Sequence, residues 1–474
     1  MNRKQSMRMP RALTGRSTGP ALATFGMLGL LAACSPETIL GNAKLPPELI
    51  DPAGLENSQG ALAAYRSASD LLREGLNGHV ADAGLLTDEL ASSAVGIGVG
   101  VSTSGVELID SRHAYAVDTK NGAGYNGLNK TRGQVRQALG MLREFAPQSS
   151  PALQGHLYAI DGYAKVMLAE VYCSGIPLSE LVYKGDYRLE GPSTTAQVLE
   201  RALASFDTAV AISADSARFL AFARVGAGRA LLGLGRLAEA AEAVAGVPTS
   251  YVYQVHYPTD QKSNFFKMPG TVWTYNMSDR EGINGLPFRS SGDPRTRFAQ
   301  VGSHTSGGPL YQPVRYNKQG TSPIVLASGI EARLIEAEAA LAADGSWLPM
   351  LNALRTDGTF TTRPNAANPA VTDTLWNAGT GGVAGLAPLA DPGAPAARVD
   401  LLFRERAYWL HLTGHRLGDL RRLVRQYDRD PDTVFPIGSY LAALGTYGRS
   451  VSLRVPETEI TFNPLYRGCL SEEA

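Results

Sequence analysis

Apolar positions along much of this 474-residue chain recur at spacings of three and four, the pattern of helices with one buried face. In GALAAYRSASDLLREGL, for example, Leu62, Tyr65, Ala68 and Leu72 share one face. Further helices are predicted at TRGQVRQALGMLREF, at TTAQVLERALASFDTAVAIS and at PALQGHLYAIDGYAKVMLAEVY. In the last of these, Pro151 stands where a first helical turn tolerates proline. The pattern predicts a mainly α protein.

Two later stretches share the shape helix, turn, second helix. The sequence GAGRALLGLGRLAEAAEAV resembles one tetratricopeptide unit, and its small residues Gly226, Ala230, Gly235 and Ala238 allow paired helices to approach closely. ASGIEARLIEAEAALAADGSWLPMLNALRT repeats the shape around the turn AADG. Because one such pair cannot bury its apolar face alone, we expect tetratricopeptide-like pairs that stack on one another.

Three segments interrupt the helices, at residues 91–127, 248–325 and 358–398. The first is rich in Gly and Ser and is predicted to be loop with short extended pieces. Loops carried on a rigid scaffold are the usual place for binding residues, so we expect ligand capture by these irregular regions. The second segment concentrates aromatic residues: Tyr251, Tyr253, Tyr257, Phe265, Phe266, Trp273, Tyr275, Phe288, Phe298, Tyr311 and Tyr316.

The N-terminus has the order of a secretory signal, with basic residues and no acidic ones in MNRKQSMRMPRALTGRSTGP, followed by the apolar run ALATFGMLGLLAA. That run is shorter than the roughly 20 residues that span a bilayer. Leu31-Ala32-Ala33-Cys34 matches a bacterial lipobox. We therefore predict a lipoprotein signal peptide over 1–33, lipidation of Cys34, a polar tether over 34–50 and one domain over 51–474. Ser35 favours the outer membrane, and secretion without lipid is the alternative.

Charge and cysteine content narrow the function further. Lys+Arg and Asp+Glu both number 44, so the formal net charge is +0 and nothing global favours nucleic acid as a partner. Only Cys173 and Cys469 remain beside Cys34, and thiols outside the cytoplasm tend to pair. We predict a disulfide between them, which would pin the C-terminus to the middle of the fold. Two separate buried thiols are the alternative.

The densest charge lies in RERAYWLHLTGHRLGDLRR, residues 404–422. HLTGH lacks the Glu of a zinc-protease motif, Gly414 interrupts a helix there, and no cysteine–histidine cluster has zinc spacing, so no metal is predicted. Acid–base catalysis by Glu405 is one interpretation. Carboxylates beside arginines at helical spacing usually form structural ion pairs, and we predict that Glu405 pairs with Arg416 while Asp419 engages a nearby arginine. No catalytic constellation or cofactor is predicted.

This block resembles one in the SusD/RagB family of nutrient-uptake surface lipoproteins. The similarity lies in Arg404-Glu405-Arg406, Gly414-His415-Arg416 and Asp419-Leu420-Arg421-Arg422. LIEAEAALAADG with LNALR is similar to the family's helix pair, SSGDPR to its DPR loop, and FPIGSY with TYGRSVSLRVPETEITFNPLY to its C-terminal segment. Trp409 and Thr413 depart from the family, which often has Glu there, and this puts the local ion pairing in question.

The resemblance implies a SusD-like α/α superhelix with long irregular insertions and a few short strands. It implies a binding protein, not an enzyme, lipid-anchored at the outer membrane and facing the cell exterior. Such a protein captures a glycan or other oligomeric nutrient, such as a peptide, as the lid of a SusC-type TonB-dependent barrel. The alternative is a tetratricopeptide-repeat lipoprotein that scaffolds an envelope assembly, but it leaves the aromatic insertions unexplained. A lipid-anchored hydrolase would need a motif that the sequence lacks.

Five residues are candidate ligand contacts. Trp273 and Tyr275 alternate in TVWTYNMSDREG, so an extended chain would place both rings on one side, where sugar faces stack well. Core packing is the alternative for either ring. Arg295, in the DPR loop, supplies a polar group beside the aromatic segment. Arg112 and Tyr125 are further candidates, because ligand sites of the resembled family often draw on that N-terminal region.

Overall fold

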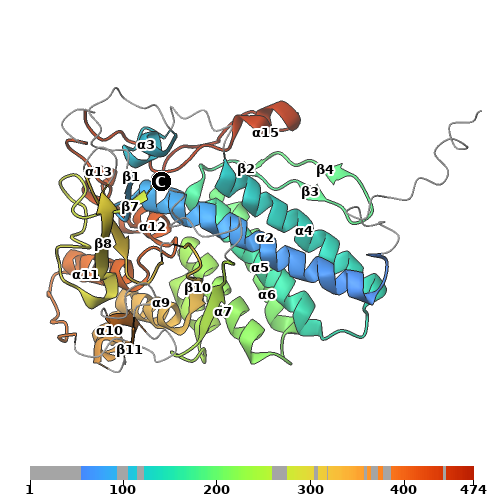
Figure 1. Ribbon diagram of the computed structural model, residues 1–474, viewed down its shortest axis with the longest axis horizontal. Helices are drawn as coiled ribbons and strands as arrows, with labels where there is room; N and C mark the ends of the chain where they lie inside the picture. Colours follow the sequence, from blue (N-terminus) through green and yellow to red (C-terminus); the bar gives the residue numbers. More distant parts are fainter. Residues whose placement is uncertain are drawn as a thin grey trace, which may run out of the picture. The chain divides into compact units, whose positions relative to one another are not determined.

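Helices dominate the computed structural model, and its strands are short, as predicted (Figure 1). The signal peptide, Cys34, the tether and Trp273 lie outside the described residues. The structure describes residues 55–92, 105–114, 122–258, 275–303, 308–317, 319–356, 360–364, 372–376, 386–440 and 445–474.

The first helices form a row in which each packs on the next (Figure 1). Local sequence fixes several of their ends: Thr194 and Gln197 form a reciprocal capping box, and Ser216 caps the following helix through its hydroxyl. The row consists of α2 (Ser58–Leu85), α4 (Ala123–Phe145), α5 (Pro151–Val171), α6 (Thr195–Ile212), α7 (Ala217–Gly233) and α8 (Leu237–Val244).

Helices α2 and α4 cross at glycines. A Cβ on Gly78 would lie 2.6 Å from the Cα of Gly124, and a Cβ on Gly127 would lie 2.9 Å from the Cα of Gly75. This close packing explains why the prediction of loop over 91–127 was wrong in part. Gly-rich sequence has low intrinsic helix propensity, but here tertiary contact requires the small residues and overrides it. The segment contains α3 (Gly105–Asp110) and the first turns of α4.

The two predicted helix pairs are confirmed. Helices α7 and α8 form one pair, joined by a turn in which Gly235 has φ +75°. The second pair is α9 (Gly329–Ala342) and α10 (Trp347–Thr356). Residues 404–422 are divided between α11 (Pro395–Trp409) and α12 (Arg416–Tyr427), because the chain turns through Gly414 at φ +83°. Shorter helices follow at α13 (Pro431–Val434) and α15 (Glu457–Phe462), and a 3-10 turn η4 spans Pro294–Thr296.

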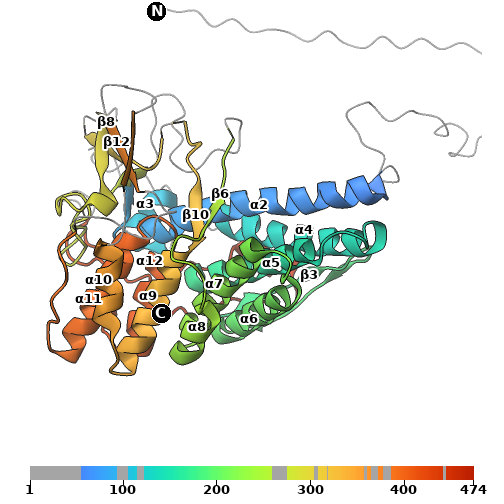
Figure 2. The same cartoon turned by 90° about the horizontal axis from the view of Figure 1, so that it is seen from below.

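The strands of the described residues form six two-stranded antiparallel sheets, chiefly within the irregular segments. Strands β6, β8, β10 and β12 lie on one side of the later helices (Figure 2). The pairs are β1 (Leu90–Ser92) with β7 (Tyr275–Met277), β6 (Val252–Val255) with β10 (Ile324–Ser328), β8 (Phe298–Ser303) with β9 (Pro309–Pro313), β11 (Phe360–Pro364) with β12 (Thr372–Trp376), β2 (Ile176–Pro177) with β5 (Pro192–Ser193), and β3 (Glu180–Leu181) with β4 (Tyr187–Arg188).

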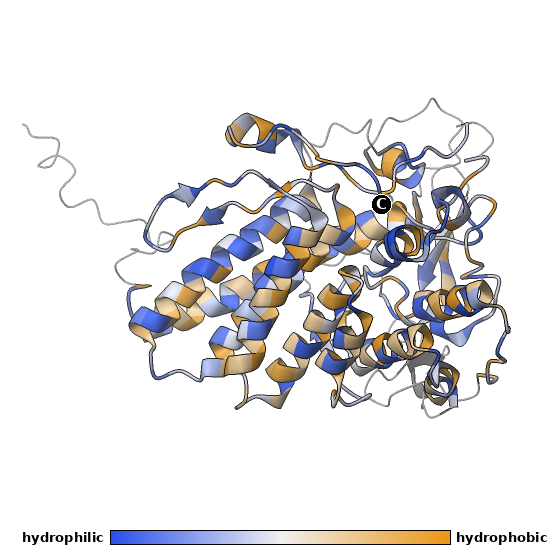
Figure 3. Ribbon diagram, turned by 180° about the vertical axis from the view of Figure 1, so that it is seen from behind, coloured by the Kyte–Doolittle hydropathy of each residue, from blue (hydrophilic) through white to orange (hydrophobic). Residues whose placement is uncertain are grey.

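Hydrophobic and hydrophilic positions alternate around the helices (Figure 3), and the apolar ones form one large core along the helix row. Much of the aromatic segment 248–325 belongs to this core. Tyr253 stacks on Phe222 with ring centroids 3.8 Å apart, and Tyr257 and Tyr316 are buried in the same core, whereas Phe288 is buried in a smaller cluster with Tyr408. The expectation that these rings face a ligand is therefore wrong for most of those described. No helix within the described ranges has the length and apolarity to cross a membrane.

Candidate functional site

Glu405 is a buried structural residue at the centre of an arginine cluster. It accepts from Arg295 at 2.6 Å and from Arg355 at 2.8 and 2.9 Å. The predicted Glu405–Arg416 pair is wrong, since Arg416 donates instead to both carboxylate oxygens of Asp88, at 2.7 and 2.9 Å. The reason is the turn at Gly414, which separates α11 from α12 and directs Arg416 to the end of α2.

Asp419 occupies the neighbouring position. Arg406 donates to both of its oxygens at 2.9 Å, and Arg422 donates to it at 3.1 Å and to Glu338 at 2.6 and 2.9 Å. Burial alone would raise the pKa of Asp419, but Arg406 and Arg422 hold it well below its usual value. We call this buried set the ionic junction; its members are Asp88, Arg295, Glu338, Arg355, Glu405, Arg406, Arg416, Asp419 and Arg422.

The histidines of HLTGH are also buried. His415 lies 3.0 Å from Glu331 and 3.0 Å from Arg229, and burial lowers the pKa of His411 well below its usual value. Within the described residues, no group of three or more His, Cys, Asp or Glu side chains is placed to hold a metal ion.

Two predicted ligand contacts are taken up by the protein itself. Arg112 is buried, with its guanidinium donating to the carbonyls of Ser450 at 3.1 Å and Pro436 at 2.7 Å. Arg295 is held by Asp293 and Glu405. Neither arginine is exposed to a ligand, so both predictions were wrong. Sequence alone does not reveal that a charged side chain will pair with groups elsewhere in the folded protein.

The two remaining described candidates differ. Tyr275 lies in β7 opposite Ser92, and its ring packs against the core, which is the alternative considered for it. Tyr125, on α4, packs edge-on against Tyr172 with ring centroids 5.2 Å apart. Its hydroxyl donates to Glu459 at 3.3 Å, and burial raises its pKa well above the usual value. Of the four, only Tyr125 lines a large cleft that lies among the described residues.

This cleft has a volume of about 920 Å³, and we call it the α4–α15 cleft. Most of its lining comes from α4, which we call its floor, and from the β3–β4 hairpin with its flanks and α15, which we call its walls; Figure 1 shows where these elements lie in the fold. Its lining residues are Leu71, Tyr125, Asn126, Asn129, Lys130, Gly133, Gln134, Pro177, Ser179, Leu181, Asp186, Tyr187, Leu189, Glu459, Phe462 and Asn463.

The floor and the C-terminal wall are held in place by hydrogen bonds. Helical spacing puts the α4 residues of the lining on one face. On the wall, the amide of Asn463 donates to Glu459 at 2.9 Å and to the carbonyl of Glu190 at 2.8 Å. Glu459 also accepts from Tyr125, so α15 is tied to the floor helix.

The rim is exposed and apolar. Tyr187 is 70% exposed and Phe462 is 77% exposed. In the same cleft, the side chains of Asn126, Lys130 and Asp186 form no hydrogen bond or ion pair within the described part of the chain. Sequence reasoning missed all of these residues. The only signal was Gln134 beside Gly133 on the predicted helix, since Asn126 lay in the segment predicted to be loop.

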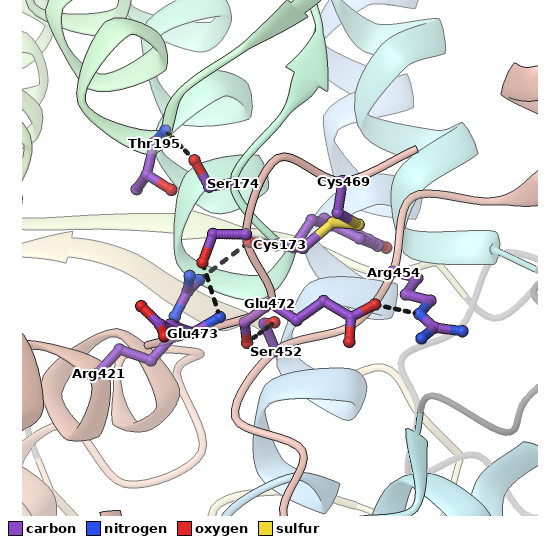
Figure 4. The surroundings of a disulfide bond; sticks show 11 residues. Cys173, Ser174, Thr195, Arg421, Ser452, Arg454, Cys469, Glu472 and Glu473 are labelled. Atoms are coloured by element: carbon purple, nitrogen blue, oxygen red, sulfur yellow. Dashed lines mark hydrogen bonds and ion pairs between the residues drawn. A yellow bond between two sulfur atoms is a disulfide. The ribbon is translucent and has the colours of Figure 1, made fainter. Parts of the chain in front are cut away.

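A disulfide joins Cys173 to Cys469 with Cα atoms 5.9 Å apart, as predicted (Figure 4). Around it, the backbone N–H of Leu470 donates to the carbonyl of Ser174 at 2.7 Å. Cys173 follows α5 and precedes the β2–β5 pair, whereas Cys469 follows α15. The bridge therefore fastens the segment that carries the C-terminal wall of the cleft to the middle of the helix row.

The architecture is that of a tetratricopeptide-like helical-repeat protein with short antiparallel hairpins in its insertions. Its fold is that of the SusD-like proteins. A SusD-like carbohydrate binding protein from Bacteroides vulgatus superposes with a TM-score of 0.59 at 13% identity, covering 86% of this chain and 97% of that one. A laminarin binding SusD-like protein superposes with a TM-score of 0.58 at 14% identity, covering 87% of this chain and 99% of that one.

The NanU protein of B. fragilis gives a TM-score of 0.58 at 13% identity, with 90% of this chain and 100% of that chain covered. Identities this low establish a shared fold alone. No protein-family model matches the sequence, and no curated protein matches it either.

Proposed function

We propose that this chain is a binding protein that captures a glycan nutrient. The observation that carries the proposal is the near-complete coverage of SusD-like structures, among them a carbohydrate binding protein and a laminarin binding protein. A match over a single helix pair would imply only a repeat scaffold. Here the match covers 86–87% of this chain and 97–99% of those chains, far more than one helix pair.

The proposal extends to the cell envelope. Cys34 follows a basic and then apolar start in a lipobox, which supports a lipid-anchored mature protein on the outer membrane. The family resemblance supports action as the lid of a SusC-type TonB-dependent barrel, facing the cell exterior. Binding without catalysis is expected, so a captured glycan is released chemically unchanged.

Calorimetric titration of the purified mature chain tests glycan capture. The panel contains laminarin oligosaccharides, α-glucans, mannans and a pool of short peptides, and each glycan is analysed by chromatography after incubation. We expect saturable binding of at least one glycan, recovered intact. Binding of peptides and of no glycan would contradict the proposal, and cleavage of the bound glycan would contradict the assignment as a non-enzyme.

Intact cells test the envelope assignment and separate it from the scaffold alternative. External protease should degrade the wild-type chain, and mild detergent extraction should co-purify a large barrel protein. Cys34→Ser should release the chain from the membrane fraction. Protection from external protease, together with co-purification of periplasmic components and no barrel, would favour the tetratricopeptide-repeat scaffold instead.

A further inference from the structure

One glycine on α4 lacks the packing reason that its neighbours have. A Cβ would lie 2.7 Å from another heavy atom at Gly124, 2.9 Å at Gly127 and 2.2 Å at Gly140. At Gly133 no heavy atom outside the glycine's own stretch of helix lies within 4 Å of that position. Glycine in a helix interior is destabilising relative to alanine, so a glycine without a close contact calls for another explanation. Its effect is to keep the floor of the α4–α15 cleft open.

Exposed apolar side chains are concentrated on the two segments that form the walls of the cleft, and Tyr187, Leu189 and Phe462 line it. Ten large hydrophobic side chains of the described ranges are exposed, and six of them come from β3–β4 with its flanks or from α15 with its continuation. Two are aromatic, one on each wall. Exposed apolar surface that is concentrated in one place marks an interaction site more often than scattered residues do. The six are Val182, Tyr187, Leu189, Ile460, Phe462 and Leu465.

The polar groups of the cleft restrict the chemistry of its ligand. Lys130 and Asp186 carry opposite charges, and Glu459 adds a carboxylate already bonded to Tyr125 and Asn463. No single sign of charge dominates, which favours an uncharged ligand. The volume of about 920 Å³ lies near the upper end for small-ligand sites, which is enough for several sugar rings.

A peptide fits the cleft less well than a glycan does. Extended peptides are usually recognised by main-chain pairing with a strand edge, and β3 and β4 span only two residues each. Sugar hydroxyls both donate and accept, so they match separate amide, ammonium and carboxylate groups. The apolar faces of sugar rings match the exposed rings of Tyr187 and Phe462.

We infer that the α4–α15 cleft is a binding site for an uncharged oligosaccharide, which stacks on Tyr187 and Phe462 and hydrogen-bonds to Asn126, Lys130 and Asp186; this inference rests on the proposed function. Gly133 provides the floor over which the chain of sugars passes. The site lies outside the aromatic segment 248–325, in which the sequence alone placed the ligand.

Four variants test the inference by titration with every glycan that the wild type binds. Gly133→Trp fills the floor and should weaken binding at least about tenfold, whereas Gly133→Ala adds one methyl group and should leave binding within about twofold. Tyr187→Ala and Phe462→Ala should each weaken binding about tenfold, since each removes one stacking ring. The matched control is Ile283→Ala, because Ile283 is 78% exposed and lies outside the cleft; it should bind like the wild type.

Melting temperatures of all variants accompany the titrations. Tyr187 and Phe462 are exposed, so their alanine variants should fold normally even if Gly133→Trp does not. Wild-type affinity in both ring variants would overturn the cleft assignment and leave glycan capture standing. A wild type that binds no glycan would overturn both proposals. A loss of affinity in Ile283→Ala equal to that of the ring variants would also overturn the assignment.

Discussion

The ionic junction and the α4–α15 cleft use polar side chains in opposite ways. In the junction, Glu405, Asp419 and Asp88 are buried, and each carboxylate accepts from at least one arginine. In the cleft, Asn126 and Lys130 are exposed and have no partner within the described residues. The junction's charges are satisfied internally and serve the fold. In the cleft, the side chains of Asn126, Lys130 and Asp186 remain available to a ligand, whereas Tyr125, Glu459 and Asn463 are already bonded to the protein.

The difference shows that a charge-dense motif is a poor guide to a site. Removing one partner from a buried pair leaves an uncompensated charge, which is costly. The charges of such a motif therefore stabilise the fold. Variants that affect folding without binding, or binding without folding, can test this separation between the two regions.

The largest effect is expected from Glu405→Ala, which leaves Arg295 and Arg355 buried without their carboxylate. The free energy of unfolding should fall by about 3–5 kcal/mol, measured by urea denaturation. Glu239→Ala is the control, because its pair with Arg236 is on the surface and should leave stability nearly unchanged. An unchanged unfolding midpoint with lost glycan binding would contradict the structural role of Glu405.

The disulfide connects the two regions, since it fastens the segment carrying the cleft wall to the core. Replacing Cys173 and Cys469 together by alanine should lower the free energy of unfolding by about 2–4 kcal/mol. Because the loosened segment includes α15, glycan binding should also weaken, while the ionic junction stays folded. Wild-type protein that is unfolded in denaturant without a reductant should show no reactive thiol at these two positions. Two titratable thiols there would contradict the bridge.

Buried carboxyl groups beside the junction should give stability a pH dependence that the exposed cleft does not share. Burial raises the pKa of Glu89 from 4.5 to about 8. The hydrogen bond from the backbone N–H of Leu412 and the positive charge of Arg416 offset this rise only in part. Between these values the folded state holds a proton that the unfolded state has lost, so stability should fall as the pH rises from about 5 to 8. The slope from this group is at most about 1.4 kcal/mol per pH unit.

Urea unfolding from pH 5 to 9 measures this slope, and Glu89→Gln should reduce it. An equal slope in that variant would show that Glu89 ionises normally.

Asp161 should give stability a pH dependence of the opposite sign. Burial raises the pKa of Asp161, but Lys165 and Arg132 lower it to about 2 overall. Its stabilising contribution is complete above about pH 4 and is lost as the pH falls through about 2.

The smallest effect concerns two glycines of α4. Gly133→Ala should raise the free energy of unfolding by about 1 kcal/mol, because the methyl group meets open space and alanine favours the helix. Gly127→Ala should lower it, because its Cβ would lie 2.9 Å from the Cα of Gly75. Equal changes of the same sign in thermal melts would show that the cleft floor and the helix crossing are not different environments.

Sequence predicted the parts of the fold that local patterns determine. The pairs at 217–244 and 329–356 have amphipathic periodicity and small-residue turns, so both were found before any contact was known. The partner of Arg416 was not found, since Asp88 is 328 positions away and only the folded chain brings them together. The cleft was not predicted for the same reason: its floor near residue 130 and its wall near residue 460 meet only through tertiary contact.

The Cys173–Cys469 bridge also determines how the molecule carries mechanical load. It spans a sequence separation of 296, so the intervening residues form a closed covalent ring. A pulling force applied between the N-terminal helices and residue 474 passes through α5 and the two sulfur atoms directly. The helices from α6 to α15 lie within the closed ring and outside that load path, so the force reaches them only through their packing. A single backbone cut within the ring likewise opens it without dividing the molecule in two.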